Sequence, residues 1–123
     1  MAKGNEVASF SMKSTSATFT LGPAGSTVTT VNFEGTATGG FGTIAGTGVF
    51  VGAKAGTLSY TGVAYMDNGD TMFSHGAGAF ESTGQHHWKT TGVMDLSDGS
   101  RMLSEGEIDL AERTWIGKVY AWT

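Results

Sequence analysis

The chain has 123 residues and a net charge of −4, with 20 glycines, one proline and no cysteine. This length predicts a single domain, residues 1–123, that buries a core without disulfide bonds or a cysteine-rich zinc site. The seven basic residues are scattered, which argues against a nucleic-acid or anionic-membrane surface. The N-terminal residues lack a leader pattern and no run of 18 apolar residues occurs, so we expect a cytoplasmic protein without a signal peptide or membrane-spanning helix.

Apolar and polar residues alternate with period two along most of the chain, which predicts strands rather than helices. The first alternating run covers residues 7–21, either as one strand bent near 14–16 or as two shorter strands. Glycine, proline, asparagine or aspartate punctuates most of the later runs, as is typical of turns. These runs are residues 28–36, 43–51, 57–66, 71–82, 86–96, 101–109 and 114–122.

Eight or nine strands joined in order by short loops must be antiparallel neighbours, because a short loop cannot cross to a parallel strand. A meander of eight strands usually closes on itself, since closure removes the exposed edges. We therefore predict an all-β fold, an eight-stranded antiparallel up-and-down β-barrel. Its interior would hold side chains or one small ligand.

The clearest hairpin lies within residues 56–82, around Asn68-Gly69. If residues 67–70 form its turn, His75 lies opposite Gly62, diagonal to Tyr60 and to Asp95 on an apolar inner face. Histidine titrates near neutral pH, so this arrangement predicts catalytic proton transfer by His75, with Asp95 orienting it and Tyr60 binding a substrate oxygen. A buried structural histidine, or a solvent-facing one after a β-bulge, is the alternative, since a one-residue slip inverts a strand. The pocket wall would consist of Phe73, Met66, Met102, Trp115 and Leu58.

A second polar site would combine Glu105 and Lys118, predicted to be opposite each other, with Trp88 on the same face. The alternative is a cross-strand ion pair on a solvated surface. On that outer face Phe50, Phe80 and Trp88 would form an exposed patch suited to a homo-oligomer interface. His86 and His87 are adjacent in a strand and point to opposite faces, so no metal site is expected.

The strand sequences FEGT at 33–36 and GTIAGTG at 42–48 resemble the glycine-rich strands of the allene oxide cyclase-like barrels, across roughly residues 28–80. The resemblance implies an eight-stranded, calycin-like barrel with an apolar central cavity, often oligomeric. It also implies activity on hydrophobic substrates, but it identifies no catalytic residue in this chain.

The function that we predict from the sequence is a small cofactor-free isomerase, cyclase or lyase that acts on a compact hydrophobic molecule by proton transfer. Two alternatives stay open: a barrel that binds a lipophilic ligand without changing it, and a structural module that works by assembly.

Overall fold

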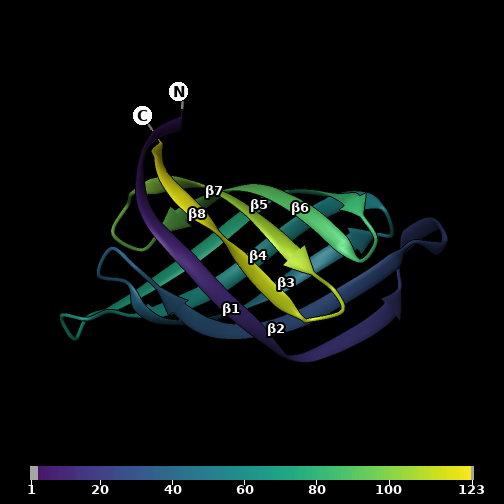
Figure 1. Cartoon of the computed structure of the whole chain (residues 1–123), viewed down its shortest axis with the longest axis horizontal. Helices are drawn as coiled ribbons and strands as arrows, with labels where there is room; N and C mark the ends of the chain where they lie inside the picture. The colour runs from purple at the N-terminus through teal and green to yellow at the C-terminus, as the bar shows by residue number, and fades with distance from the viewer. Residues whose placement is uncertain (1–2, 123) are drawn as a thin grey trace.

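The computed structural model describes residues 3–122 as a closed barrel of eight antiparallel strands in meander order (Figure 1). This confirms the predicted all-β up-and-down barrel. The first run is one long strand, β1, which pairs with both β2 and β8 and so closes the sheet. A 3₁₀ turn, η1 (Pro23–Gly25), connects β1 to β2. The strands are β1 (Lys3–Leu21), β2 (Thr27–Ala37), β3 (Gly42–Gly52), β4 (Ala55–Tyr65), β5 (Thr71–Gly84), β6 (His87–Leu96), β7 (Arg101–Asp109) and β8 (Thr114–Trp122). In the described part of the chain, no helix is long and apolar enough to cross a membrane.

The β4–β5 connection is a three-residue hairpin loop. Gly69 N–H donates to the Met66 carbonyl oxygen at 3.0 Å, and Met66 N–H donates to the Asp70 carbonyl oxygen at 2.8 Å. Gly69 has φ +93°, the left-handed conformation that glycine adopts readily and that a bulged hairpin loop of this kind requires. Tyr65 therefore lies opposite Thr71, one residue away from the predicted register.

The β6–β7 connection repeats this loop. Gly99, at φ +91°, donates its N–H to the Leu96 carbonyl oxygen at 3.0 Å, and Asp95 lies opposite Arg101. Side chains alternate across a strand, so each shifted register inverts the face assigned to the next strand. The two shifts cancel: the faces predicted for β7 and β8 are right, whereas those predicted for β5 and β6 are inverted. The faces predicted for β3 are inverted as well, because Phe50, expected on the outer face, lies opposite Leu58 inside the barrel.

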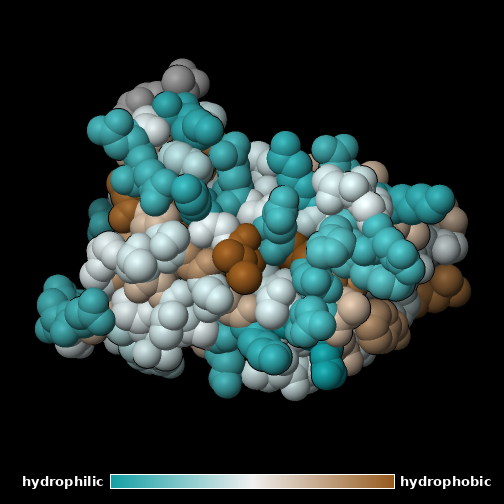
Figure 2. All heavy atoms as spheres, in the orientation of Figure 1, coloured by the Kyte–Doolittle hydropathy of each residue, from teal (hydrophilic) through white to brown (hydrophobic). Residues whose placement is uncertain are grey.

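The interior side chains of β3 through β7 are the even-numbered ones. The predicted inward position of His75, Phe73 and Asp95 is therefore wrong, because all three lie on the outer surface. The predicted exposed patch is also wrong, because Phe50, Phe80 and Trp88 are buried inside the barrel. Outside, the surface is mostly hydrophilic with isolated apolar areas (Figure 2).

An aromatic plug, defined as Phe50, Phe80 and Trp88, fills one end of the barrel. The ring centroids of Phe80 and Trp88 are 4.3 Å apart, and Phe50 lies 5.7 Å from Phe80 and 5.4 Å from Trp88. Phe50 is completely buried. Trp115 packs edge-on against Phe50 at 5.9 Å and lies between the plug and the rest of the interior. Such ring pairs contribute about 0.5–1.5 kcal/mol each beyond their buried area.

The two ends of the barrel differ. The plugged end carries the connections β3–β4, β5–β6 and β7–β8, together with the β1–β2 hairpin. The opposite end, called here the cavity end, carries the connections β2–β3, β4–β5 and β6–β7. The start of β1 and the end of β8 also lie there, paired through Lys3 and Trp122 (Figure 1).

Candidate functional site

The interior at the cavity end is not filled by side chains. A cavity of about 100 Å³ remains there, and its walls are almost entirely apolar. Its floor is made of buried residues, among them Trp115, Phe10 and Leu58. Nearer the rim, Phe41 and Met72 are only half-buried, which leaves the cavity accessible from this end of the barrel.

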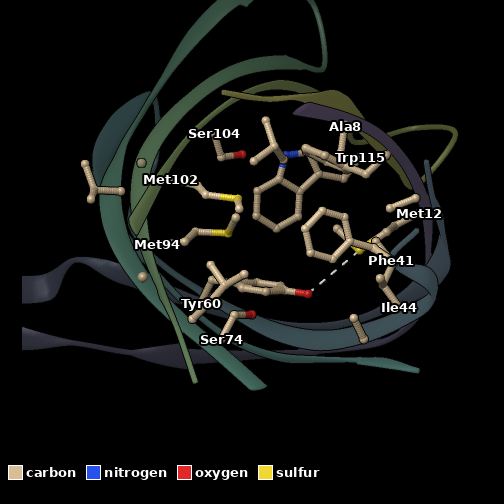
Figure 3. A pocket seen from close by; sticks show the side chains of 18 of the residues that line it. Ala8, Met12, Phe41, Ile44, Tyr60, Ser74, Met94, Met102, Ser104 and Trp115 are labelled. Atoms are coloured by element: carbon tan, nitrogen blue, oxygen red, sulfur yellow. Dashed lines mark hydrogen bonds between the residues drawn. The ribbon is translucent and has the colours of Figure 1, made fainter. Parts of the chain in front are cut away.

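Methionine is enriched in the cavity wall. Four of the six methionines in the chain line it: Met12, Met72, Met94 and Met102. In Figure 3, Met94 and Met102 point into the pocket from one side, whereas Met12 and Phe41 lie on the other. Methionine side chains are unbranched and polarisable, so they adapt to the shape of whatever they contact. A wall of this composition suits an apolar guest of variable shape.

Tyr60 is the main polar group of the cavity, and two glycines make room for its ring. A Cβ atom at Gly46 would come within 2.2 Å of the Tyr60 hydroxyl oxygen, and one at Gly62 within 2.5 Å. Gly46 and Gly62 are cross-strand partners on β3 and β4. The ring therefore lies against bare backbone, which holds the hydroxyl inside the barrel (Figure 3).

The Tyr60 hydroxyl is an available hydrogen-bond donor. Among the described residues its one hydrogen-bond partner is the Met12 sulfur, at 3.9 Å, which is a weak acceptor at that distance. Burial raises the pKa of Tyr60 to about 12, because the phenolate loses its hydration in the apolar interior. At neutral pH the group is protonated and can donate to a ligand oxygen.

Three other polar side chains face the cavity. The Trp115 indole N–H donates to Thr90 Oγ1 at 3.1 Å, so both groups are already partnered. Ser74 and Ser104 line opposite sides of the pocket, with Ser74 next to Tyr60 (Figure 3). The cavity thus offers a hydroxyl pair, Tyr60 and Ser74, on one wall of an otherwise apolar space.

The structure separates the three residues predicted to be catalytic. Tyr60 lies inside, while His75 and Asp95 are cross-strand partners on the outer face of β5 and β6. There Asp95 accepts a hydrogen bond from Arg101 Nε at 2.7 Å. This bond is the main reason that the pKa of Asp95 lies below its ordinary value, and the charge of His75 lowers it further. The predicted alternative, a solvent-facing His75, describes the observed position.

Of the five residues predicted to form the pocket wall, three do so. Leu58, Met102 and Trp115 line the cavity. Phe73 is 60% exposed on the outer face of β5, and Met66 lies in the β4–β5 loop.

The second predicted site is not a pocket. Glu105 and Lys118 are opposite each other in register, as expected, but each pairs with a β1 residue instead. Lys3 Nζ lies 3.3 Å from Glu105 Oε1, and Lys118 Nζ lies 3.3 Å from Glu6 Oε1. These side chains are substantially exposed, and exposed pairs contribute little to stability. Trp88 is on the other side of the sheet, in the plug.

The adjacent histidines lie at the plugged end. His86 adopts φ +61° in the β5–β6 turn, and His87 Nε2 lies 3.8 Å from Asp109 Oδ2. Within residues 3–122, no group of three or more histidine, aspartate or glutamate side chains is placed to hold a metal ion.

Sequence reasoning missed most of the cavity wall, including Met12, Met72, Met94, Phe41 and Ser74. One signal could have found three of them. Met72 and Met94 share even numbering with Ser74 on β5 and β6, so correct loop registers would have placed all three inside with Tyr60.

Comparison of the chain with protein-family models, with curated proteins and with solved structures found no match. The resemblance to the allene oxide cyclase-like barrels therefore stays a prediction, and the function must be argued from the cavity itself.

Proposed function

We propose that this barrel binds a small, predominantly apolar molecule carrying one hydrogen-bond acceptor, in the cavity beneath Phe41. The observation that carries the proposal is an apolar cavity with several methionines and one weakly engaged buried donor, the Tyr60 hydroxyl, whose hydrogen bond within the described residues goes to the Met12 sulfur at 3.9 Å. Pockets that combine an apolar lining with a few placed polar groups are typical ligand sites.

The volume limits the ligand. Drug-sized molecules occupy pockets of roughly 300–1,000 Å³, whereas an engineered apolar cavity of about 150 Å³ takes up benzene. On the same scale a cavity of about 100 Å³ holds roughly four non-hydrogen atoms as it stands, and rearrangement of the flexible methionine side chains would extend this to a ligand of roughly six to eight. A small cyclic or branched ketone, aldehyde or ester has the right size and polarity.

Binding is favoured over proton transfer because of what lines the cavity. No histidine, carboxylate or amine is among the lining residues, and the ionisable one, Tyr60, holds its proton until about pH 12. An acid–base catalyst works best with a pKa near the operating pH. Tyr60 can orient a carbonyl group, but it has no second group beside it to accept a proton.

A matched pair of probes tests the hydrogen bond. Cyclohexanone and methylenecyclohexane have the same shape, but only the ketone accepts a hydrogen bond. Both should change the fluorescence of Trp115 and the methyl NMR signals of the methionines, and the ketone should bind more tightly. Tyr60→Phe should weaken the binding of cyclohexanone about 2- to 10-fold, which is the range expected from the loss of a hydrogen bond with a net contribution of about 0.5–1.5 kcal/mol. Methylenecyclohexane should be unaffected. Equal losses for the two probes would show that the hydroxyl does not select the ligand.

A cavity-filling variant tests the location. Ala64 is buried and lines the cavity. A leucine at this position should fill the space that the ligand would occupy, so Ala64→Leu should weaken the binding of both probes at least about tenfold. The matched control is Ala79→Leu, which adds the same atoms on the outer face of β5. If Ala64→Leu binds the probes as well as the control does, the proposed site is wrong.

A further inference from the structure

One segment of the sheet is paired on one side only. The pairing of β1 with β8 ends at Lys13 and Thr114, and Ser14 N–H makes a last bond to the Arg113 carbonyl oxygen at 2.9 Å. A register shift between Ser14 and Ser16 follows, where β1 carries one extra residue. Beyond it, residues 16–21 pair with β2 alone. Figure 1 shows this hairpin extending past the plugged end of the barrel.

The extension is exposed on both faces, including its apolar one. Phe19 lies opposite Thr29 and Ala17 opposite Val31, so they share the face that lines the barrel interior further along the sheet. Yet Phe19 is 70% exposed and Leu21 is 83% exposed, because β1 continues past the end of its pairing with β8, whereas β2 beside it stays paired with β3. Hydrophobic surface is visible at this end of the molecule in Figure 2.

A free strand edge normally carries a device that prevents further pairing, such as an inward lysine, a proline, a β-bulge or a very short strand, and here the bulge lies at the start of the edge, between Ser14 and Ser16. Here residues 14–21 contain no charged residue and no proline, and six residues in a row are unpaired on one side. Water can solvate such a row of backbone N–H and C=O groups, but another strand can pair with it and cover the apolar side chains beside it as well. We propose that this edge pairs with the same edge of a second copy of the chain, antiparallel, across a two-fold axis.

A second copy fits this edge for two reasons. An antiparallel pairing centred on Phe19 places Phe19 against the partner's Phe19 and Ala17 against the partner's Leu21, so that apolar residues meet across the axis. On the other face, Thr18 meets the partner's Thr20, and threonine pairs hydrogen-bond across strands. The edge is also the uncharged part of a chain with net charge −4, so two copies repel each other least there. The same patch serves both subunits, as two-fold symmetry requires.

The proposal is independent of the cavity, which opens at the other end of the barrel. It predicts a dimer in sedimentation velocity, with the dimer fraction rising with protein concentration. Phe19→Lys puts two ammonium groups opposite each other across the axis and should weaken dimerisation at least about tenfold. Phe73→Lys is the matched control, because Phe73 is 60% exposed on the outer face of β5 and should leave the dimer intact.

Charge exchange makes the test specific. Phe19→Glu alone should also be monomeric, whereas an equimolar mixture of Phe19→Lys and Phe19→Glu should sediment as a dimer. In the wild type, amide hydrogen exchange within residues 16–21 should slow as the protein concentration rises, and in Phe19→Lys it should not. A wild-type protein that stays monomeric at every concentration overturns the proposal, even if a strand of another protein binds the edge. A dimer that Phe19→Lys and Phe73→Lys weaken equally overturns it as well.

Discussion

Two polar aromatic side chains of one hairpin, the phenol of Tyr60 and the imidazole of His75, lie on opposite faces of the sheet. Tyr60 and His75 are both polar residues within alternating strands of one hairpin, but only Tyr60 faces the interior. Tyr60 is held there because Gly46 and Gly62 leave space for its ring against the backbone. The same burial that makes its hydroxyl a ligand donor also fixes its ionisation, and this has a measurable consequence for stability.

Tyr60 should make the fold sensitive to alkaline pH. Its pKa is raised from 10.0 to about 12 in the folded protein, so between these values the unfolded chain releases a proton that the folded protein keeps. The stabilisation is therefore fully present below pH 10 and is lost as the pH rises towards 12. The loss attributable to this group is about 2–3 kcal/mol.

Urea unfolding at several pH values between 8 and 12 should show this loss in the wild type. In Tyr60→Phe, which keeps the ring but cannot ionise, the loss of stability between pH 8 and 12 should be smaller by about 2–3 kcal/mol. All other ionisable groups are the same in the two proteins, so the wild type and Tyr60→Phe differ only by this hydroxyl. Identical alkaline profiles for the two proteins would show that the Tyr60 hydroxyl is not buried as described.

At the scale of elements, the strands and their order could be predicted from the sequence, but the pairing register could not. Period-two alternation and the Asn68-Gly69 and Asp98-Gly99 turns were sufficient for the eight-stranded meander. The same dipeptides fit loops of different length, and the length decides which face each side chain takes. Each turn was interpreted as four residues long. The structure has three-residue loops instead, flanked by Met66 and Asp70 and by Leu96 and Ser100. This difference inverted the faces predicted for the side chains of β5 and β6.

That inversion accounts for most of the site error. It placed His75, Asp95 and Phe73 in the cavity and removed Met72, Ser74 and Met94 from it. β4, β7 and β8 were assigned to the right faces, which is why Tyr60, Leu58, Met102 and Trp115 were found. Backbone hydrogen bonds within the loops carry this information. In β6 the side-chain pattern agrees with them, because Trp88, Met94 and Leu96 alternate with His87, Lys89 and Asp95.

The β6–β7 hairpin provides a test at this scale, because two carboxyl groups in it have lowered pKa values from different partners. Asp95 owes its lowered pKa chiefly to the hydrogen bond from Arg101, whereas Asp98 owes its own chiefly to the Ser100 hydroxyl at 2.6 Å. Arg101→Gln should therefore raise the pKa of Asp95 and leave that of Asp98 unchanged, as measured by carbon-13 NMR of the carboxyl groups.

The sign for stability follows from the direction of these shifts. A carboxyl group with a lowered folded pKa stabilises the fold above its ordinary pKa of 3.8, and the contribution disappears as the pH falls through the folded value. Thermal unfolding temperatures should therefore fall below about pH 4, and less steeply in Arg101→Gln. An Asp95 signal that titrates at the same pH in both proteins would rule out the register in which Asp95 faces Arg101.

At the scale of the whole molecule, the barrel separates stability from binding. The plugged end is packed with aromatic rings at 4.3–5.7 Å from one another, whereas the cavity end keeps about 100 Å³ unfilled. An unfilled apolar volume costs stability, since the surrounding atoms lose contacts on one side. A small domain can carry that cost at one end because its other end is densely packed. The proposed dimer edge extends from the plugged end, so dimerisation would not block the entrance to the cavity at the other end.

This division predicts unequal costs for two truncations. Phe50→Ala removes a completely buried ring from the centre of the plug and should lower the free energy of unfolding by about 3–5 kcal/mol. Met102→Ala removes a half-buried side chain that already borders the cavity, so it loses fewer contacts and should cost about 1–2 kcal/mol. Ala64→Leu fills the cavity and should cost nothing or stabilise the fold, because its added atoms occupy space that no side chain fills. Urea unfolding at neutral pH, with the slope of each transition checked against the wild type, measures all three. If Met102→Ala costs as much as Phe50→Ala, the two ends are equally packed, and the cavity is too tight to admit a ligand.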